Sequence, residues 1–129
     1  MSLEITISHE YDDGLNVTIA GSLDSNTAPL LQERIDSEIN DGINIIIINF
    51  KELIFLSSAG LRIIFKAKKI MDNRGGKFLL VNMQPQINKV FEIVKALDGM
   101  NVFKSQDEMD TYLTTMQNKV LNGELWLSY

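Results

Sequence analysis

The sequence predicts an α/β fold: a mixed, mostly parallel sheet of four to five strands with about four helices packed mainly on one side. Three observations support this fold class. Residues 3–8 alternate apolar with polar side chains, which is typical of a half-buried strand. Residues 43–50, INIIIINF, are a continuous β-branched run that fits a strand covered on both faces. After this run, strand patterns alternate with helical patterns, which implies right-handed crossovers between parallel strands.

The pattern of the first 40 residues predicts a hairpin of two strands that is followed by a helix. The alternation of residues 3–8 returns at residues 15–19, and the turn-forming sequence DDG lies between the two segments. A helical spacing of apolar residues then covers residues 30–39, behind the candidate N-caps at residues 25–27. The sequence NDG ends this helix.

The central strand is followed by further helices and strands. A helix with an apolar stripe from Leu61 to Met71 comes first, and the sequence NRGG ends it. Beyond it we predict, in order, a strand at residues 77–82, a helix from Pro85 to Leu97, a short strand at Val102 and Phe103, and a last helix from the capping sequence SQDE at residues 105–108 to about Val120.

The length of 129 residues fits one domain with a real core. We place this domain at residues 1–121 and regard residues 122–129, NGELWLSY, as a C-terminal aromatic tail. The apolar content of the tail is high for a segment in free solvent. We therefore expect the tail to pack on the domain or on a second copy. In the second case the protein would be a homodimer.

Composition excludes several classes of function. A net charge of -5 argues against nucleic acid as the partner, because nucleic-acid binders usually carry a basic surface. The absence of cysteine excludes disulfides, thiolate metal sites and cysteine nucleophiles. The N-terminal sequence lacks the pattern of a signal peptide, and no apolar run reaches the length of about 18 residues needed to span a membrane. We expect a cytoplasmic protein without a membrane partner.

Catalysis has weak support in the sequence. His9 is the only histidine, so a serine hydrolase would need His9 to reach Ser57 or Ser58. The sequence LSSAG also lacks the glycine that precedes the serine of a nucleophile elbow by two places. We therefore predict that the protein is not an enzyme.

Metal and cofactor sites have no clear candidates. Asp12 and Asp13 lie in a predicted turn, and the acidic residues 107–110 lie in a first helical turn, where the helix dipole already favours carboxylates. The pair Gly75–Gly76 follows a helix, whereas a phosphate-binding loop precedes one. We predict neither a metal nor a cofactor.

The segment SSAG at residues 57–60 lies between a predicted strand and a predicted helix. One serine can act as the helix N-cap, which stabilises a helix by about 1 kcal/mol. A cap alone does not explain a second hydroxyl next to two small residues. Phosphorylation does, because a phosphate adds about -1.5 to -2 charges, and a helix N-terminus tolerates negative charge. A partner at the same surface would then meet bulk and charge in place of a hydroxyl.

Three segments resemble the STAS domain of bacterial anti-sigma-factor antagonists. The segment LIFLSSAGLRIIFKAKK is similar to the signature of this family, and VTIAGSLDSNTAPLL is similar to its second strand and Gly-x-Leu-Asp turn. The segment GGKFLLVNMQPQINKVFEIVKALD is similar to its later strand, Asn-x-x-Pro turn and third helix. The order is the family's order, and the resemblance covers about residues 3–116.

The resemblance implies a phosphorylation-switched binding protein. In this family the unphosphorylated antagonist binds an anti-sigma factor that is also a serine-protein kinase, phosphorylation breaks the complex, and a metal-dependent serine phosphatase restores it. The phosphoacceptor implied by the resemblance falls on Ser58, and Ser57 is the alternative. Ser57 stands at the position where many members of the family have aspartate. The partner-binding corner implied by the resemblance consists of Asp24, Ser57, Ser58, Ala59, Gly60 and Leu61.

A second hypothesis keeps the fold but changes the function. STAS-like domains serve in several contexts, and fold does not determine function. The chain could be a scaffold, or a nucleotide- or lipid-binding regulatory subunit of a transporter or of a signalling assembly. In that case a phosphorylatable Ser58 would be incidental.

Overall fold

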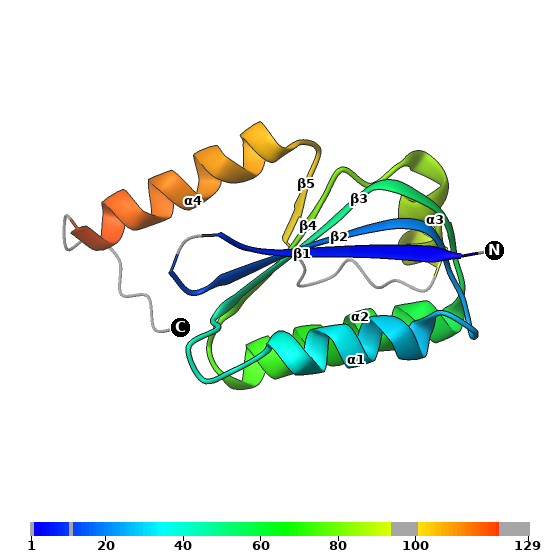
Figure 1. The fold of residues 1–129 in the computed structure, drawn as a ribbon. Coiled ribbons are helices and arrows are strands. Elements are labelled where there is room, and N and C mark those ends of the chain that lie inside the picture. Colours follow the sequence, from blue (N-terminus) through cyan, green and yellow to red (C-terminus); the bar gives the residue numbers. More distant parts are fainter. Residues whose placement is uncertain (1, 11, 94–100, 122–129) are drawn as a thin grey trace.

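The computed structural model describes residues 2–10, 12–93 and 101–121, and its sheet contains five strands. The strands lie in space in their order along the chain, with β1 at one edge and β5 at the other (Figure 1). β1 is antiparallel to β2, and all other neighbours are parallel, which confirms the predicted mixed, mostly parallel sheet. The bounds are β1 (Leu3–Glu10), β2 (Gly14–Leu23), β3 (Ile45–Leu56), β4 (Lys77–Val81) and β5 (Asn101–Phe103).

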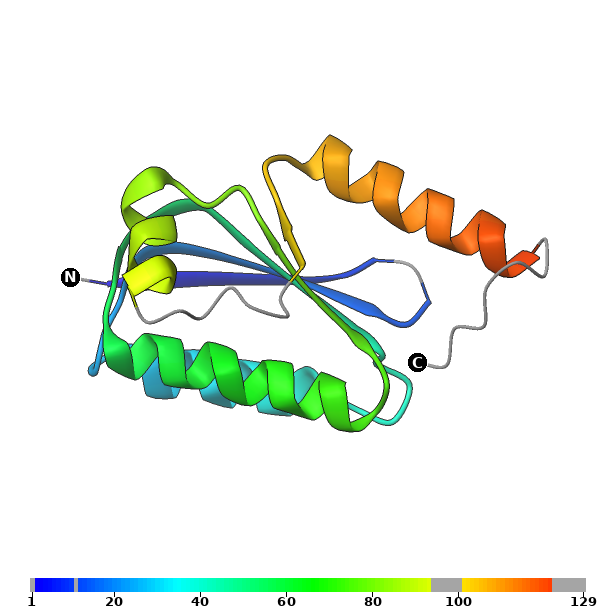
Figure 2. The ribbon, with the colours of Figure 1, turned by 180° about the vertical axis from the view of Figure 1, so that it is seen from behind.

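The described residues form four helices on two faces of this sheet. Helices α1 and α2 lie side by side on one face, and α4 lies on the opposite face (Figures 1 and 2). Buried side chains of α1, α2 and α3 belong to one apolar cluster, so the prediction that the helices pack mainly on one side is confirmed, with α4 as the exception. The bounds are α1 (Ala28–Glu38), α2 (Ser58–Asn73), α3 (Pro85–Ile93) and α4 (Gln106–Leu121).

The first part of β3, residues 45–48, is covered on both faces, as its β-branched run predicts. Ile46 and Ile48 pack in the larger cluster with α1, α2 and α3. Ile45 and Ile47 point to the other face and pack in the smaller cluster with Met109 and other residues of α4 and β5. Because successive side chains of a strand point to opposite faces, four consecutive isoleucines contribute to two cores at once.

The structure differs from the sequence-based expectation mainly in the length of β3. The strand was expected at residues 43–50, but it continues to Leu56 and pairs with β2 along most of its length. The first turn of α2 therefore follows this strand directly. The predicted continuation of α3 to Leu97 and the tail at residues 122–129 lie outside the described residues.

Candidate functional site at the start of helix α2

The parallel strands β2 and β3 bring two turns together. Leu23 and Leu56 are paired at the ends of these strands, and the backbone N–H of Ser57 donates to the carbonyl oxygen of Leu23 over 2.9 Å. Both strands lead into their helices at the end of the sheet where β1 begins (Figure 2). Asp24, the next residue after Leu23, therefore lies beside the start of α2, as the resemblance implied.

The two adjacent serines differ in their roles. Ser57 is the N-cap of α2, with an extended backbone, and its Oγ accepts a hydrogen bond from the backbone N–H of Gly60 over 3.3 Å. Its side chain is half-buried. Ser58 is the first residue of α2 and is exposed. The structure thus separates a capping serine from an exposed serine in the first turn of the helix.

This difference predicts unequal effects of two alanine substitutions on stability. Ser57→Ala removes the acceptor for an N-terminal amide and should lower the free energy of unfolding by about 1 kcal/mol. Ser58→Ala removes an exposed hydroxyl and should change it by no more than about 0.5 kcal/mol. Urea denaturation followed by circular dichroism checks both values. Equal losses in the two variants would contradict the assignment of the cap.

Asp24 holds the neighbouring turn in one conformation. Its Oδ1 accepts hydrogen bonds from the backbone N–H groups of Asn26 (2.9 Å) and Thr27 (3.1 Å). The hydroxyl of Thr27 donates to the carbonyl oxygen of Ser22 over 2.8 Å. A half-buried carboxylate that closes its own turn in this way gives the corner a fixed shape as well as a negative charge.

Gly60 and Leu61 have internal roles. A Cβ atom at Gly60 would lie 2.6 Å from Cγ of Leu23, so glycine is needed for α2 to approach the end of β2. Leu61 is 4% exposed and belongs to the larger apolar cluster. Neither residue offers a side chain to a partner. The accessible part of the predicted site is Asp24, Ser57, Ser58 and Ala59, which we call the serine corner.

The structure also places two large apolar residues on the surface, which the sequence analysis did not single out. Ile54 and Phe55, near the end of β3, are 58% and 45% exposed. The sequence signal for this exposure was the run of four consecutive apolar residues, Leu53 to Leu56. All four cannot face one core in a strand, because successive side chains point to opposite faces.

A serine hydrolase is excluded by the position of His9. His9 pairs with Leu15 in the β1–β2 ladder, and its Nε2 lies 3.3 Å from a carboxylate oxygen of Glu38. The backbone of Ser57, by contrast, is hydrogen-bonded to Leu23 at the other end of β2. The stretch from Leu15 to Leu23 spans about 26 Å at the usual rise of a strand. The only histidine therefore cannot activate either serine of the corner.

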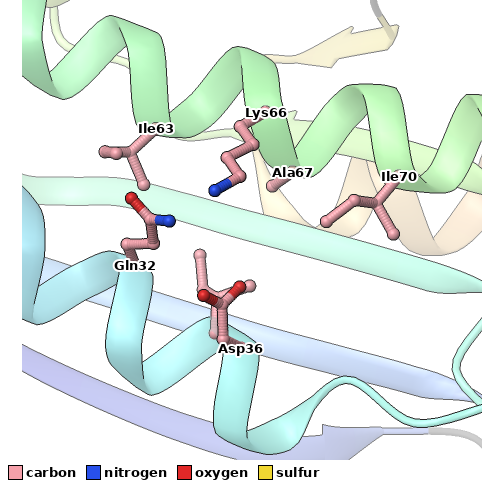
Figure 3. A pocket seen from close by; sticks show the side chains of 7 residues that line it. Gln32, Asp36, Ile63, Lys66, Ala67 and Ile70 are labelled. Carbon is pink, nitrogen blue, oxygen red and sulfur yellow. The ribbon is translucent and has the colours of Figure 1, made fainter.

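Other sites for chemistry are few in the described part of the chain. Residues 2–10, 12–93 and 101–121 contain no group of three or more His, Cys, Asp or Glu side chains that could hold a metal ion. Within the same ranges, no helix is long and apolar enough to cross a bilayer. A hollow between α1 and α2, where Lys66 lies across from Gln32 and Asp36, has a volume of only about 10 Å³ (Figure 3). This is about the minimum for one water molecule.

Comparison with known families identifies the fold. The STAS domain matches residues 5–109, which include all of the serine corner. The chain belongs to the STAS domain family. The resemblance noted in the three sequence segments is thereby confirmed over most of the chain.

Curated and solved STAS proteins are similar along almost their whole length. The anti-sigma-B factor antagonist of Listeria monocytogenes is 25% identical over 111 residues, which cover 85% of this chain and 96% of the relative. The crystal structure of an anti-sigma factor antagonist from Mycobacterium paratuberculosis superposes with a TM-score of 0.75 at 22% identity, covering 86% of this chain and 93% of the other. The Bacillus cell fate determinant SpoIIAA in its phosphorylated form gives a TM-score of 0.67 at 21% identity, covering 84% and 99%.

These names agree with the predicted class of function. The Listeria and Mycobacterium proteins are named anti-sigma factor antagonists, and such antagonists are regulatory proteins and not enzymes. At identities below 25% the solved structures support the STAS fold alone.

Proposed function

We propose that this STAS domain is an anti-sigma factor antagonist that is switched by phosphorylation. It binds an anti-sigma serine kinase in the cytoplasm through the serine corner, and it releases the kinase when Ser58 is phosphorylated. A metal-dependent serine phosphatase reverses the modification. The observation that carries this proposal is the separation of roles between Ser57, which caps α2, and Ser58, which is exposed in its first turn.

The geometry suits a switch that leaves the fold intact. A phosphate on Ser58 would lie beside the N–H groups of the first helical turn and the positive end of the helix dipole, both of which favour negative charge. The cap made by Ser57 would remain, because it uses a different hydroxyl. The added charge and bulk would be presented to solvent, at the surface where a partner binds.

The relatives support the same reading of the corner. Proteins named anti-sigma factor antagonists match nearly their full lengths, and one solved relative from Bacillus is described in a phosphorylated form. Asp24 lies beside the acceptor and is held in place by its own turn. A kinase surface that recognises the unmodified corner must accommodate one carboxylate and a hydroxyl, and a phosphate would add a second negative group.

Phosphate transfer from ATP tests the acceptor. We expect an anti-sigma serine kinase of the same organism, purified and supplied with ATP, to move one γ-phosphoryl group to the protein and leave ADP. Tryptic mass spectrometry should map the phosphate to Ser58, and Ser58→Ala should abolish it. Ser57→Ala is the matched control and should still be modified. Phosphate on Ser57, or no transfer from any of the organism's anti-sigma kinases, would contradict the proposal.

Ligand binding is the second candidate function. It is favoured by a hollow of about 440 Å³ at the carboxyl ends of β4 and β5, beside the middle of β3, with Lys51, Asn82, Lys104 and Ser105 in its lining. Ligands of open α/β sheets usually bind at this edge. As a nucleotide- or lipid-binding subunit of a transporter or signalling assembly, the domain would retain such a ligand during purification. Native mass spectrometry of the purified protein distinguishes this function from the first.

A further inference from the structure

We propose that Ile54 and Phe55 form an apolar anchor that holds the partner kinase next to the serine corner. This inference rests on the proposed function, because it assigns a second contact area to the same partner. The apolar contact would contribute binding energy through side chains that phosphorylation does not modify. The anchor would set affinity and choice of partner, while Ser58 would set the timing of release.

The outward position of both side chains is built into the sheet. The pairing of β3 with β2 shifts twice, between Thr18 and Ala20 and between Gly21 and Ser22. In a regular strand two adjacent side chains point to opposite faces, so one of this pair would face the core. The register shifts instead leave Ile54 and Phe55 58% and 45% exposed. Bulges of this kind commonly re-aim side chains beside functional sites.

The residues on either side show that the outward turn is local. Leu53 is fully buried and Leu56 is 5% exposed, and both belong to the larger apolar cluster. The strand thus keeps its place in the core while two large apolar side chains between them face solvent. An isolated exposed apolar residue is ordinary, but adjacent ones form a patch that is typical of an interaction site. Phenylalanine is also enriched in the cores of interfaces.

Distance assigns this patch to the partner that binds the serine corner. Ser58 is the third residue after Phe55, so their Cα atoms lie at most about 11 Å apart. A standard interface buries about 800 Å² on each partner, which corresponds to a disc with a radius of about 16 Å. A kinase centred on Ser58 would therefore reach the neighbourhood of Phe55 in an interface of ordinary size.

The surroundings of the patch have the composition of an interface rim. Lys51 and Glu52, which precede the patch on β3, are exposed and carry opposite charges. A polar rim around an apolar centre is the usual anatomy of a binding surface. The kinase surface that fits it would offer an apolar pocket for Phe55, with polar groups at its border.

Val102 provides a matched control on the same sheet. It is 36% exposed and pairs with Leu80 on β4, and Leu80 pairs with Ile48 on β3. The stretch from Ile48 to Leu56 spans about 26 Å at the usual rise of a strand. Val102 is therefore an exposed apolar strand residue well outside an interface centred on Ser58.

Threonine substitutions test the anchor, because threonine keeps the β-branched shape that strands favour. We expect Phe55→Thr to weaken binding of the purified kinase about 30-fold and Ile54→Thr about tenfold, measured by titration calorimetry. Val102→Thr should change affinity less than twofold. Circular dichroism spectra should be unchanged, and Ile54→Thr keeps the test decisive if Phe55→Thr fails to fold.

The outcomes separate the anchor from the proposed function. If both variants bind the kinase as the wild type does, while Ser58→Asp no longer binds, the anchor is refuted and the switch stands. If the wild type binds no anti-sigma kinase of the organism, the proposed function fails and the anchor fails with it. A loss of affinity in Val102→Thr equal to that in Phe55→Thr also refutes the anchor. So does a change from dimer to monomer in sedimentation with unchanged kinase affinity, because the patch would then bind a second copy.

Discussion

Ser58→Asp should weaken binding of the anti-sigma kinase by at least about a hundredfold, because an unpaired carboxylate would be buried at the interface. The folded domain should tolerate the change. Aspartate in the first turn of α2 is favoured by the helix dipole, so the free energy of unfolding should stay level or rise by about 0.3–1 kcal/mol. Titration calorimetry with the purified kinase and urea denaturation measure the two effects separately.

Ser57→Asp is the matched control for this prediction. It introduces the same charge one residue earlier, but aspartate and serine are about equally good N-caps. The carboxylate of Ser57→Asp should therefore accept the bond from the Gly60 amide that Ser57 accepts in the native protein. We expect this variant to keep most of its affinity. Equal losses from both substitutions would show that the corner responds to charge in general and not to the chemistry at Ser58.

Phe91→Ala should lower the free energy of unfolding by about 3–5 kcal/mol, which is the usual cost of removing a buried aromatic ring. The side chain of Phe91 is fully buried. Its ring meets those of Phe50 and Phe65 edge-on, with centroid distances of 5.9 Å and 6.5 Å. Phe91 thus joins α3 to β3 and to α2, the strand and the helix on either side of Ser57.

Denaturant unfolding of Phe91→Ala and of the neighbouring Glu92→Ala checks this expectation. Glu92 is exposed, so its replacement should change stability by no more than about 0.5 kcal/mol. A cost below about 1 kcal/mol for Phe91→Ala would contradict the view that α3 is held by this cluster.

Much of the fold could be predicted from local patterns. The alternation in residues 3–8 and 15–19 gave the hairpin, and the isoleucines of residues 43–50 gave a strand with two covered faces. Period and β-branching are properties of a short window, so the sequence alone reveals them. The sheet face on which α4 packs could not be predicted in this way, because it depends on the path of the chain across the sheet.

The burial pattern at the end of β3 could not be predicted from the sequence, for a physical reason. Phe50, Leu53 and Leu56 are the buried residues there, at a spacing of three. This spacing results from the register shifts against β2 and matches neither the period of a regular strand nor a buried run. The exposure of Ile54 and Phe55 therefore follows from pairing with a distant segment, which the local pattern does not contain.

The candidate site was predictable in place but not in detail. The resemblance to the STAS family placed Asp24 near the two serines, and in the structure the paired ends of β2 and β3 hold these residues at one corner. Which serine caps α2 depends on the residue at which the helix begins, and sequence patterns fix that only within a few residues. The burial of Gly60 depends on Leu23, which is near it only in the folded protein.

The order of the strands has a consequence for biosynthesis. Each strand pairs with the strand that precedes it in the chain, so the sheet grows at one edge only. A chain that leaves the ribosome from its N-terminus can add β3 to a finished hairpin, then β4, then β5, and no strand has to be inserted between two others. Besides the permanent edge at β1, a partly synthesised chain therefore exposes only one further unpaired edge, and the next strand covers it as soon as it is made.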